Sequence, residues 1–205
     1  MSNPWEAVPL DTYETHMKSD GVGQLQALSE IMKCQFARHT PKTVCVLGVA
    51  GGNGLEHIDL ACTKRIYGID VSEAYLSTCR QRFASLGDRL SLIRMDLCDE
   101  VSQIPQVDLI IADLLIEYIG IETFTRLVDA AGAAGVCCAV QQNCGVSFVS
   151  SSPCAQALQS IGTLHQDIDP QALAAAMLRI GYNEMFREEV LLPGGKKLIC
   201  IDFMR

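Results

Sequence analysis

Two aspartates follow a glycine cluster at the spacing that a nucleoside-binding site requires. Asp70 ends the apolar segment 65–70 and lies 22 residues after Gly48, the first glycine of the stretch 43–54, TVCVLGVAGGNG. A carboxylate about 20 residues beyond a glycine turn can accept hydrogen bonds from both hydroxyls of a ribose. Asp96 directly follows the next apolar segment, and its carboxylate could accept a hydrogen bond from the amino group of an adenine.

The glycine cluster would let such a ligand approach the main chain. Glycines at 48, 51, 52 and 54 have no Cβ to hold a bulky group away, and they tolerate the positive φ angles of a tight turn. An ordinary tight turn is the simpler interpretation of the cluster on its own. The apolar run before it, together with the two aspartates, favours a buried strand that delivers backbone to a cofactor.

The segments around these residues predict an α/β fold. Five of them are apolar on both faces, as strands of a parallel sheet covered by helices are. These predicted strands are 43–49, 65–70, 90–95, 107–112 and 136–141. Helical patterns and caps predict helices at 21–38, from about 53, from Ser72 to Gly87, at 121–131 and from Pro170 to Gly181. A turn at 193–195 predicts a C-terminal hairpin of 184–192 and 196–203.

The glycine turn and the acids after the second and third strands resemble those of the class I S-adenosylmethionine-dependent methyltransferases. The resemblance covers roughly residues 40 to 205. It implies a Rossmann-like, doubly wound sheet of seven strands in the order 3-2-1-4-5-7-6, with strand 7 antiparallel, and S-adenosyl-L-methionine as the cofactor. The expected cofactor-binding residues are Gly48, Ala50, Gly52, Asn53, Asp70, Val71, Asp96, Leu97 and Asp113.

Two positions depart from the pattern of that family. Val46 stands two residues before the first glycine, where the family commonly has an acid, and Ala50 stands where a glycine is common. Because of the first departure, Asn53, Glu56 or Asp113 would have to hold the amino group of the methionine. The same departure leaves an alternative function, in which the protein binds the cofactor without turnover, as a sensor or an inactive partner.

A nicotinamide-dependent enzyme is the other alternative, and the sequence disfavours it. The dinucleotide pattern GxGxxG needs glycines at offsets zero, two and five, and no window from 48 to 57 supplies them. None of the five tyrosines is followed by a lysine four residues later. The Tyr-x-x-x-Lys pair that short-chain reductases use for proton transfer is therefore absent.

Three side chains are candidates for a general base: Glu117, Glu14 and His16. Methyl transfer from a sulfonium is an in-line displacement, so the protein must mainly align the reacting atoms in a pocket that excludes water. A base helps when the acceptor is a hydroxyl or an ammonium group. Glu117 follows the fourth predicted strand in an apolar context, and the other two residues lie in an N-terminal arm.

Charge and composition favour a small-molecule acceptor over nucleic acid. The formal net charge is −8, and the basic residues do not form the concentrated face that grips phosphates. Segment 112–115, Ala-Asp-Leu-Leu, lacks the prolines and the aromatic residue that amino-directed nucleic-acid methyltransferases carry after strand four. No metal is expected, because Gln142 replaces the second acid of the Mg²⁺ site that Asp113 and Asn143 otherwise match in part.

The 205 residues suffice for one domain with a sizeable core. We expect an irregular N-terminal arm or lid at 1–20, a helix at 21–38, a cofactor-binding core at 43–142, an insertion at 143–168, and a C-terminal helix and hairpin at 169–205. Ligands of open α/β sheets bind beyond the carboxyl ends of the strands. The arm, the loop after strand four and the insertion should therefore recognise the substrate.

The sequence indicates a cytoplasmic protein. No apolar run approaches the 18 or so residues that a membrane-spanning helix needs, and the N-terminus lacks a basic segment followed by an apolar one. Ten cysteines without a CxxC arrangement are too few for a disulfide scaffold. Those in predicted strands, Cys45, Cys137, Cys138 and Cys200, are interpreted as reduced core thiols.

Overall fold

A seven-stranded sheet in the order β3-β2-β1-β4-β5-β7-β6 forms the centre of the computed structural model, which describes residues 3–99, 103–143, 150 and 152–205. Neighbouring strands among β1 to β5 pair in parallel, and β7 runs antiparallel to both β5 and β6. The strands are β1 (Thr43–Leu47), β2 (Arg65–Asp70), β3 (Leu90–Arg94), β4 (Leu109–Asp113), β5 (Gly135–Asn143), β6 (Asn183–Leu191) and β7 (Lys196–Met204). The predicted strand order and the antiparallel strand are confirmed.

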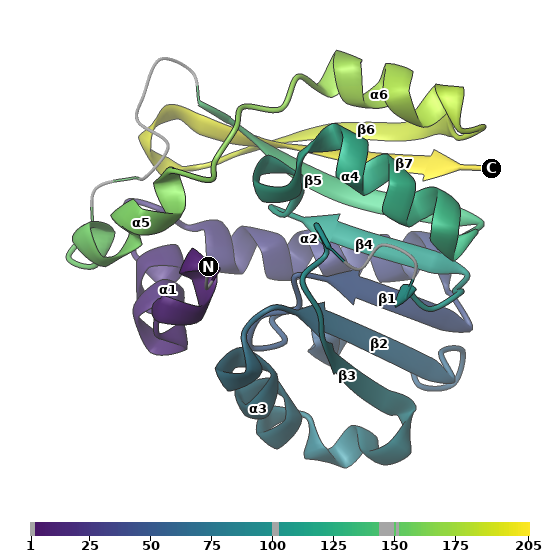
Figure 1. The fold of residues 1–205 in the computed structure, drawn as a ribbon, viewed down its shortest axis with the longest axis horizontal. Helices are drawn as coiled ribbons and strands as arrows, with labels where there is room; N and C mark the ends of the chain where they lie inside the picture. The colour runs from purple at the N-terminus through teal and green to yellow at the C-terminus, as the bar shows by residue number, and fades with distance from the viewer. Residues whose placement is uncertain (1–2, 100–102, 144–149, 151) are drawn as a thin grey trace.

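Helices cover both faces of the sheet, as strands that are apolar on both sides require. Helices α2 (Gln24–His39) and α3 (Glu73–Arg82) pack on one face, and α4 (Ile116–Ala131) and α6 (Pro170–Arg179) pack on the other. Figure 1 shows α4 and α6 in front of the sheet and α2 behind it. The side chains that these helices bury against the strands include Met32, Phe36, Leu76, Phe124, Leu127, Leu173 and Met177.

Two predicted helix starts are confirmed by their caps. The Ser72 hydroxyl accepts a hydrogen bond from the Tyr75 amide at the start of α3. The Asp169 carboxylate accepts one from the Gln171 amide at the start of α6. Such capping signals depend only on residues within one helical turn, so the sequence alone can predict them.

The N-terminal arm is helical, so the expectation of an irregular segment at 1–20 is wrong. It consists of a 3₁₀ turn, η1 (Pro4–Ala7), and α1 (Leu10–Lys18). No side chain caps the start of α1, and an isolated helix of this length is unstable in water. Tertiary contacts hold it instead, since Met17 is buried. Figure 1 shows α1 close to α5 (Gln159–Gly162), by the carboxyl ends of the parallel strands.

The helix expected from about residue 53 is only a 3₁₀ turn, η2 (Leu55–His57), so this prediction is wrong. Just beyond the turn, the Asp59 carboxylate accepts a hydrogen bond from the Ala61 amide. Such bonds between a side chain and the nearby backbone compete with helix formation.

Helix α4 (Ile116–Ala131) is kinked at Gly120, whose φ of 78° and ψ of 160° are not helical. Its longer part therefore begins after Gly120, in agreement with the helix predicted at 121–131. The sequence pattern did not predict the helical turn before the kink, which contains Glu117.

The insertion predicted at 143–168 is partly helical. It contains η5 (Ala155–Leu158) and α5, which pack against the N-terminal arm. Residues 144–149 and 151 of this insertion lie outside the described part of the chain.

The four strand cysteines are buried and not in disulfides. This confirms their interpretation as reduced core thiols. Among the described residues, no helix combines the length and the apolar character that crossing a bilayer demands.

Replacing Gly52 with alanine is expected to destabilise the fold by about 2 to 4 kcal/mol. Its φ is +90°, and a Cβ would lie 2.5 Å from Phe83 Cε2 and 2.9 Å from Cys79 Sγ. Gly132→Ala is the control, because Gly132 also has a positive φ, +60°, but its Cβ position has no neighbour within 4 Å. Thermal unfolding should give a clearly lower Tm for Gly52→Ala than for Gly132→Ala. Equal Tm values would show that the contact with Phe83 is unimportant.

Candidate active site

A cavity lies beyond the carboxyl ends of β1 to β4 and encloses about 750 Å³ of space that is open to solvent. We call it the strand-end cavity. The predicted cofactor-binding residues that line it are Gly48, Ala50, Asp70, Val71, Asp96, Leu97 and Asp113. The fold therefore brings most of the predicted set together in one place.

Asp70 is held at the end of β2 by backbone amides. Its Oδ2 accepts a hydrogen bond from the Ala50 amide at 2.9 Å, and its Oδ1 accepts one from the Ser72 amide at 2.9 Å. Burial raises the pKa of this carboxyl, and the amide contacts oppose the shift. Because each carboxylate oxygen has two lone pairs, both oxygens can also accept a hydrogen bond from a hydroxyl of a ligand in the cavity.

Asp96 connects the end of β3 to the N-terminal arm. Its Oδ2 accepts a hydrogen bond from Asn3 Nδ2 at 3.1 Å, and its Oδ1 accepts one from the Cys98 amide at 3.0 Å. Val71 and Leu97 line the same cavity. An apolar wall beside one polar group suits a flat heterocycle such as adenine. The contact with Asn3 was not foreseen from the sequence.

The glycine turn separates the strand-end cavity from a neighbouring space, the glycine-turn cavity, whose lining includes Gly48, Ala50, Gly51, Asn53, Asp113 and Glu14. Gly48 and Ala50 line both cavities and have positive φ angles of 69° and 47°. Asn53 lines only the second cavity, and its Nδ2 donates to a backbone carbonyl of α2 at 3.0 Å. Gly52 lines neither, because its backbone packs against the Phe83 ring.

Asp113, at the end of β4, lies where these two cavities meet. Gln35 Nε2 donates to its Oδ1 at 3.0 Å, whereas Oδ2 is buried without a hydrogen-bond partner among the described residues. Burial raises the pKa of Asp113 to about 7. A ligand that brings an ammonium group would satisfy this oxygen.

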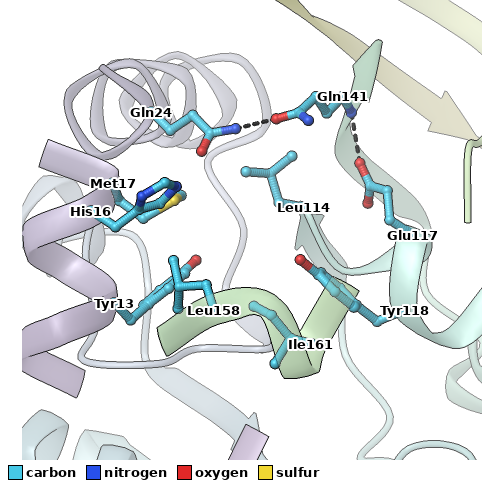
Figure 2. A pocket seen from close by; sticks show the side chains of 10 residues that line it. All are labelled: Tyr13, His16, Met17, Gln24, Leu114, Glu117, Tyr118, Gln141, Leu158 and Ile161. Carbon is cyan, nitrogen blue, oxygen red and sulfur yellow. Dashed lines mark hydrogen bonds between the residues drawn. The ribbon is translucent and has the colours of Figure 1, made fainter. Parts of the chain in front are cut away.

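A third space, the inner chamber, adjoins the strand-end cavity, and Figure 2 shows the side chains that line it. It is lined by Tyr13, His16, Met17, Gln24, Leu114, Glu117, Tyr118, Gln141, Leu158 and Ile161. Tyr13, Leu114 and Tyr118 line both spaces. A ligand in the chamber would therefore lie next to a ligand in the strand-end cavity.

Glu117 supplies the acidic group of the inner chamber. Its side chain is almost fully buried, at 1% exposure. Its Oε1 accepts a hydrogen bond from the Gln141 amide at 2.6 Å, and Oε2 has no partner among the described residues. Burial raises the pKa of Glu117 to about 7. A carboxyl with such a pKa can accept and release a proton at neutral pH.

His16 lines the inner chamber together with Glu117, whereas Glu14 does not. His16 Nδ1 forms a hydrogen bond with Ser152 Oγ at 2.7 Å, and burial lowers the pKa of the imidazole. Both carboxylate oxygens of Glu14 accept hydrogen bonds from Arg82, at 2.5 and 2.7 Å. Glu14 thus ties the arm to α3 and faces the glycine-turn cavity.

An aromatic cluster that sequence reasoning missed lies at the junction of the cavity and the chamber. Trp5 makes edge-to-face contacts with Tyr13 and Tyr118, with ring centroids 5.4 and 5.0 Å apart. Tyr13 stacks near Tyr75 at 6.4 Å. These residues come from the arm, α3 and α4, so no local pattern links them. The one signal is the placement of the chain's single tryptophan in the N-terminal arm.

The two carboxyls without a full set of partners should make the stability of the ligand-free protein depend on pH. Folding raises the pKa of Asp113 and of Glu117 from ordinary values of 3.8 and 4.5 to about 7. Between about pH 4 and 7 the native state therefore binds more protons than the unfolded state, and the free energy of unfolding falls as the pH rises. These groups cost no stability below that window, and above it they cost on the order of a few kcal/mol.

The double variant Asp113→Asn with Glu117→Gln isolates this effect, because neither amide titrates. Its Tm should fall less than that of the wild-type protein between pH 4.5 and 7.5, a range of about 3 pH units that covers the window. If Tm changed equally with pH in the double variant and the wild-type protein, folding would not raise the pKa of these two carboxyls.

A separate cluster of His39, Cys137 and Asp202 is close enough in space to share a metal ion. Asp202 is already engaged, because its carboxylate accepts hydrogen bonds from Arg38 Nε at 2.7 Å and from His39 Nε2 at 2.8 Å. A guanidinium at this distance would repel a metal cation. We therefore interpret the cluster as a structural ion pair between α2 and β7.

Residues 45–134 match the model of a methyltransferase domain family. This segment runs from β1 to the end of α4 and contains Asp70, Asp96 and Asp113. The chain contains a class I S-adenosylmethionine-dependent methyltransferase domain. Solved structures of this fold hold S-adenosylmethionine or S-adenosylhomocysteine. The residues present fit such a cofactor, because the cavity offers acids at two strand ends and the Oδ2 of Asp113, which is buried without a partner among the described residues.

Solved methyltransferase structures share the fold over nearly the whole chain. Magnesium protoporphyrin IX methyltransferase from Synechocystis PCC 6803 with bound cofactor gives a TM-score of 0.70 at 13% identity, covering 100% of this chain and 94% of that one. The N-methyltransferase NodS from Bradyrhizobium japonicum WM9 with S-adenosylhomocysteine gives 0.66 at 12% identity, covering 96% and 97%. A protein of Pyrococcus horikoshii provisionally assigned as an RNA methyltransferase gives 0.59 at 12%, covering 90% and 83%.

At these identities the likeness shows the fold and leaves the methyl acceptor undetermined. A comparison with curated protein sequences gives no match.

Proposed function

We propose that this methyltransferase transfers the methyl group of S-adenosylmethionine to a small molecule bound in the inner chamber. The observation that carries the proposal is Glu117, a buried carboxylate in a chamber that adjoins the strand-end cavity, with one oxygen that has no partner among the described residues. A buried carboxylate without partners is costly unless a ligand satisfies it. We therefore expect the chamber to bind a molecule that has a hydrogen-bond donor.

In this proposal the nucleoside of the cofactor lies across the carboxyl ends of β2 and β3. Asp70 accepts hydrogen bonds from the ribose hydroxyls, because its two oxygens are held in place by backbone amides. Asp96 accepts a hydrogen bond from the adenine amino group. Val71 and Leu97 supply apolar contact to the adenine ring, since both line the same cavity.

The methionine part of the cofactor then follows the glycine turn. Gly48 and Ala50 let it pass close to the main chain, and Asp113 binds its ammonium group through the free Oδ2. Asp113 would thus serve in place of the acid that Val46 replaces. Asn53 lines the same cavity and is a further candidate contact.

The bound cofactor supplies an electrophilic methyl group. Glu117 accepts the proton that the acceptor loses, since a pKa of about 7 matches neutral conditions. His16, fixed through Nδ1, offers its other ring nitrogen to orient the acceptor. Tyr13, Tyr118 and Trp5 exclude water from the junction between the two ligands.

The arm at 3–18 acts as the lid of this site. The contacts that hold it down are Asn3 to Asp96, Tyr75 to Val8 and Arg82 to Glu14. Because Tyr13 lines the strand-end cavity and the inner chamber, both ligands must pass the arm. A partly exposed ion pair such as Glu14 with Arg82 contributes only about 1 kcal/mol or less, so the arm can open at small cost.

A small-molecule acceptor fits the charge of the site better than RNA does. The described lining residues of the two cavities and the chamber include no lysine or arginine, and the net charge is −8. Binding to a phosphate backbone requires positive charge. The named acceptor of one structural neighbour, a magnesium porphyrin, is compatible with this class.

Mass spectrometry with a labelled methyl donor tests the proposal. The purified protein is incubated with S-adenosylmethionine carrying a trideuteromethyl group and with a cell metabolite extract. We expect at least one small molecule to gain the trideuteromethyl group, and Asp70→Ala to abolish the labelling. Label found only in added RNA, or in no molecule at all, would overturn the proposal.

A further inference from the structure

We propose that the methyl acceptor is a small amine, which enters the inner chamber as an ammonium ion and is bound there by Glu117 and two tyrosine rings. This inference rests on the proposed function and adds the chemical class of the acceptor. It is argued from the charge of the chamber, the free oxygen of Glu117 and the character of the walls.

The described walls of the site carry acidic side chains and no lysine or arginine. Among the described lining residues of the inner chamber, Glu117 is the one charged side chain apart from the titratable His16. The adjoining cavities contribute further acids, which are Asp70, Asp96, Asp113 and Glu14. Arg82 is paired with Glu14. Lys196, buried at the start of β7, is absent from the described lining but lies near enough to His16 to help lower the pKa of its imidazole. Because acids outnumber this one nearby cation among the described residues, an ammonium ion is attracted more than a carboxylate or phosphate.

The free oxygen of Glu117 requires a donor, and an ammonium group supplies both a donor and a charge. Oε1 is used by the Gln141 amide at 2.6 Å, and Oε2 is buried without a partner among the described residues. A hydroxyl acceptor would satisfy the hydrogen bond but would leave the buried negative charge uncompensated. Charge-assisted hydrogen bonds between an ammonium and a carboxylate are roughly twice as strong as neutral ones. An amine therefore fits this oxygen better than an alcohol does.

The remaining walls suit a cation with an apolar body. Figure 2 shows Tyr13 and Tyr118 on opposite sides of the chamber, with Leu158 and Ile161 between them. Aromatic faces attract ammonium groups, and the tyrosine hydroxyls can accept further N–H bonds. Met17, like the two aliphatic side chains, offers apolar contact. We therefore expect an ammonium group attached to a hydrocarbon or aromatic body.

The same arrangement explains how the amine becomes a nucleophile. The nitrogen lone pair of an ammonium ion is occupied by a proton, so this proton must leave first. In a dry chamber burial lowers the pKa of an ammonium and raises that of a carboxyl, and the pKa of Glu117 is raised to about 7. The N–H bond breaks, an O–H bond forms at Oε2, and the electron pair of the N–H bond stays on nitrogen. The products of this step are a neutral amine and a neutral glutamic acid side chain.

A binding series with three probes of equal size tests the inference. Benzylamine, benzyl alcohol and benzoate are titrated into the full chain saturated with S-adenosylhomocysteine, and binding is followed by calorimetry and by Trp5 fluorescence. Trp5 is a suitable reporter because it is the single tryptophan and contacts Tyr118. We expect benzylamine to bind at least about tenfold more tightly than benzyl alcohol, and benzoate to bind least.

Two variants complete the experiment. Glu117→Gln should lose the preference for benzylamine, and Glu122→Gln, at an exposed acid of the same helix, should keep it. Affinity for S-adenosylhomocysteine is measured in each variant to show that the site is folded. If S-adenosylhomocysteine fails to bind the wild-type chain, the proposed function is wrong. If it binds but benzylamine does not bind, or has no advantage over benzyl alcohol or benzoate, or keeps that advantage in Glu117→Gln, this inference alone is wrong.

Discussion

The Asp70→Ala variant is expected to bind S-adenosylhomocysteine at least about 100-fold more weakly than the wild-type protein, which corresponds to about 2.7 kcal/mol. The substitution removes the acceptor proposed for the ribose hydroxyls. It also leaves the Ala50 and Ser72 amides without their partner, so the glycine turn loses support. A hydrogen bond to a charged group contributes about 1.5 to 3 kcal/mol, and more than one is lost here. Calorimetric titration measures the effect.

Asp108→Ala is the matched control for this variant. Asp108 also bridges two backbone amides, those of Lys42 and Thr43 at 3.0 and 2.9 Å, but it lies at the amino ends of β1 and β4. Its loss should lower the Tm and leave the affinity for S-adenosylhomocysteine unchanged. Equal affinity in Asp70→Ala and the wild-type protein, or equal losses in both variants, would remove Asp70 from the ribose site.

The Glu117→Gln variant is expected to lower kcat by about 10²- to 10⁴-fold once a methyl acceptor is in hand, which is the usual contribution of a general base. Glutamine keeps the size of the side chain and can still accept the Gln141 amide, so binding of S-adenosylhomocysteine should be retained. The ionised carboxylate is the active form. The kcat/KM of the wild-type enzyme should therefore rise with pH and level off above about 7.

The variant should lack this rise in kcat/KM, because an amide has no proton to lose in this range. Glu122→Gln, on the exposed side of α4, serves as the control and should keep both the rate and the pH profile. A Glu117→Gln enzyme with wild-type kcat, or with the same pH profile, would show that another group removes the proton.

The strand ends that line the strand-end cavity could be predicted because their determinants are local. Each strand is a short apolar run, and Asp70 and Asp96 are adjacent in sequence to the strands they follow. Once parallel strands are inferred, their carboxyl ends must meet at one edge of the sheet. The convergence of these two acids then follows without any long-range information, whereas the order of the strands was implied by the resemblance to the class I methyltransferases.

The contacts that complete the site could not be predicted, because they join segments that are distant in the sequence. Gln35 and Asp113 are 78 residues apart, and Asn3 and Asp96 are 93 apart. Helix α1 has no capping side chain and is held by tertiary contacts. Its sequence therefore lacks a local helix signal, and the pattern predicted an irregular arm. The turn of α4 that contains Glu117 likewise begins without a capping side chain. Tertiary packing rather than local preference sets the structure at these positions.

A crystal structure with bound S-adenosylhomocysteine tests the central claim most directly, namely that the carboxyl ends of β2 and β3 hold one nucleoside beside the inner chamber. We predict ribose hydroxyls within hydrogen-bond distance of Asp70, the adenine amino group at Asp96, and the sulfur at Leu114, facing the inner chamber. A nucleoside bound away from both aspartates, or a sulfur directed away from the inner chamber, would contradict the account.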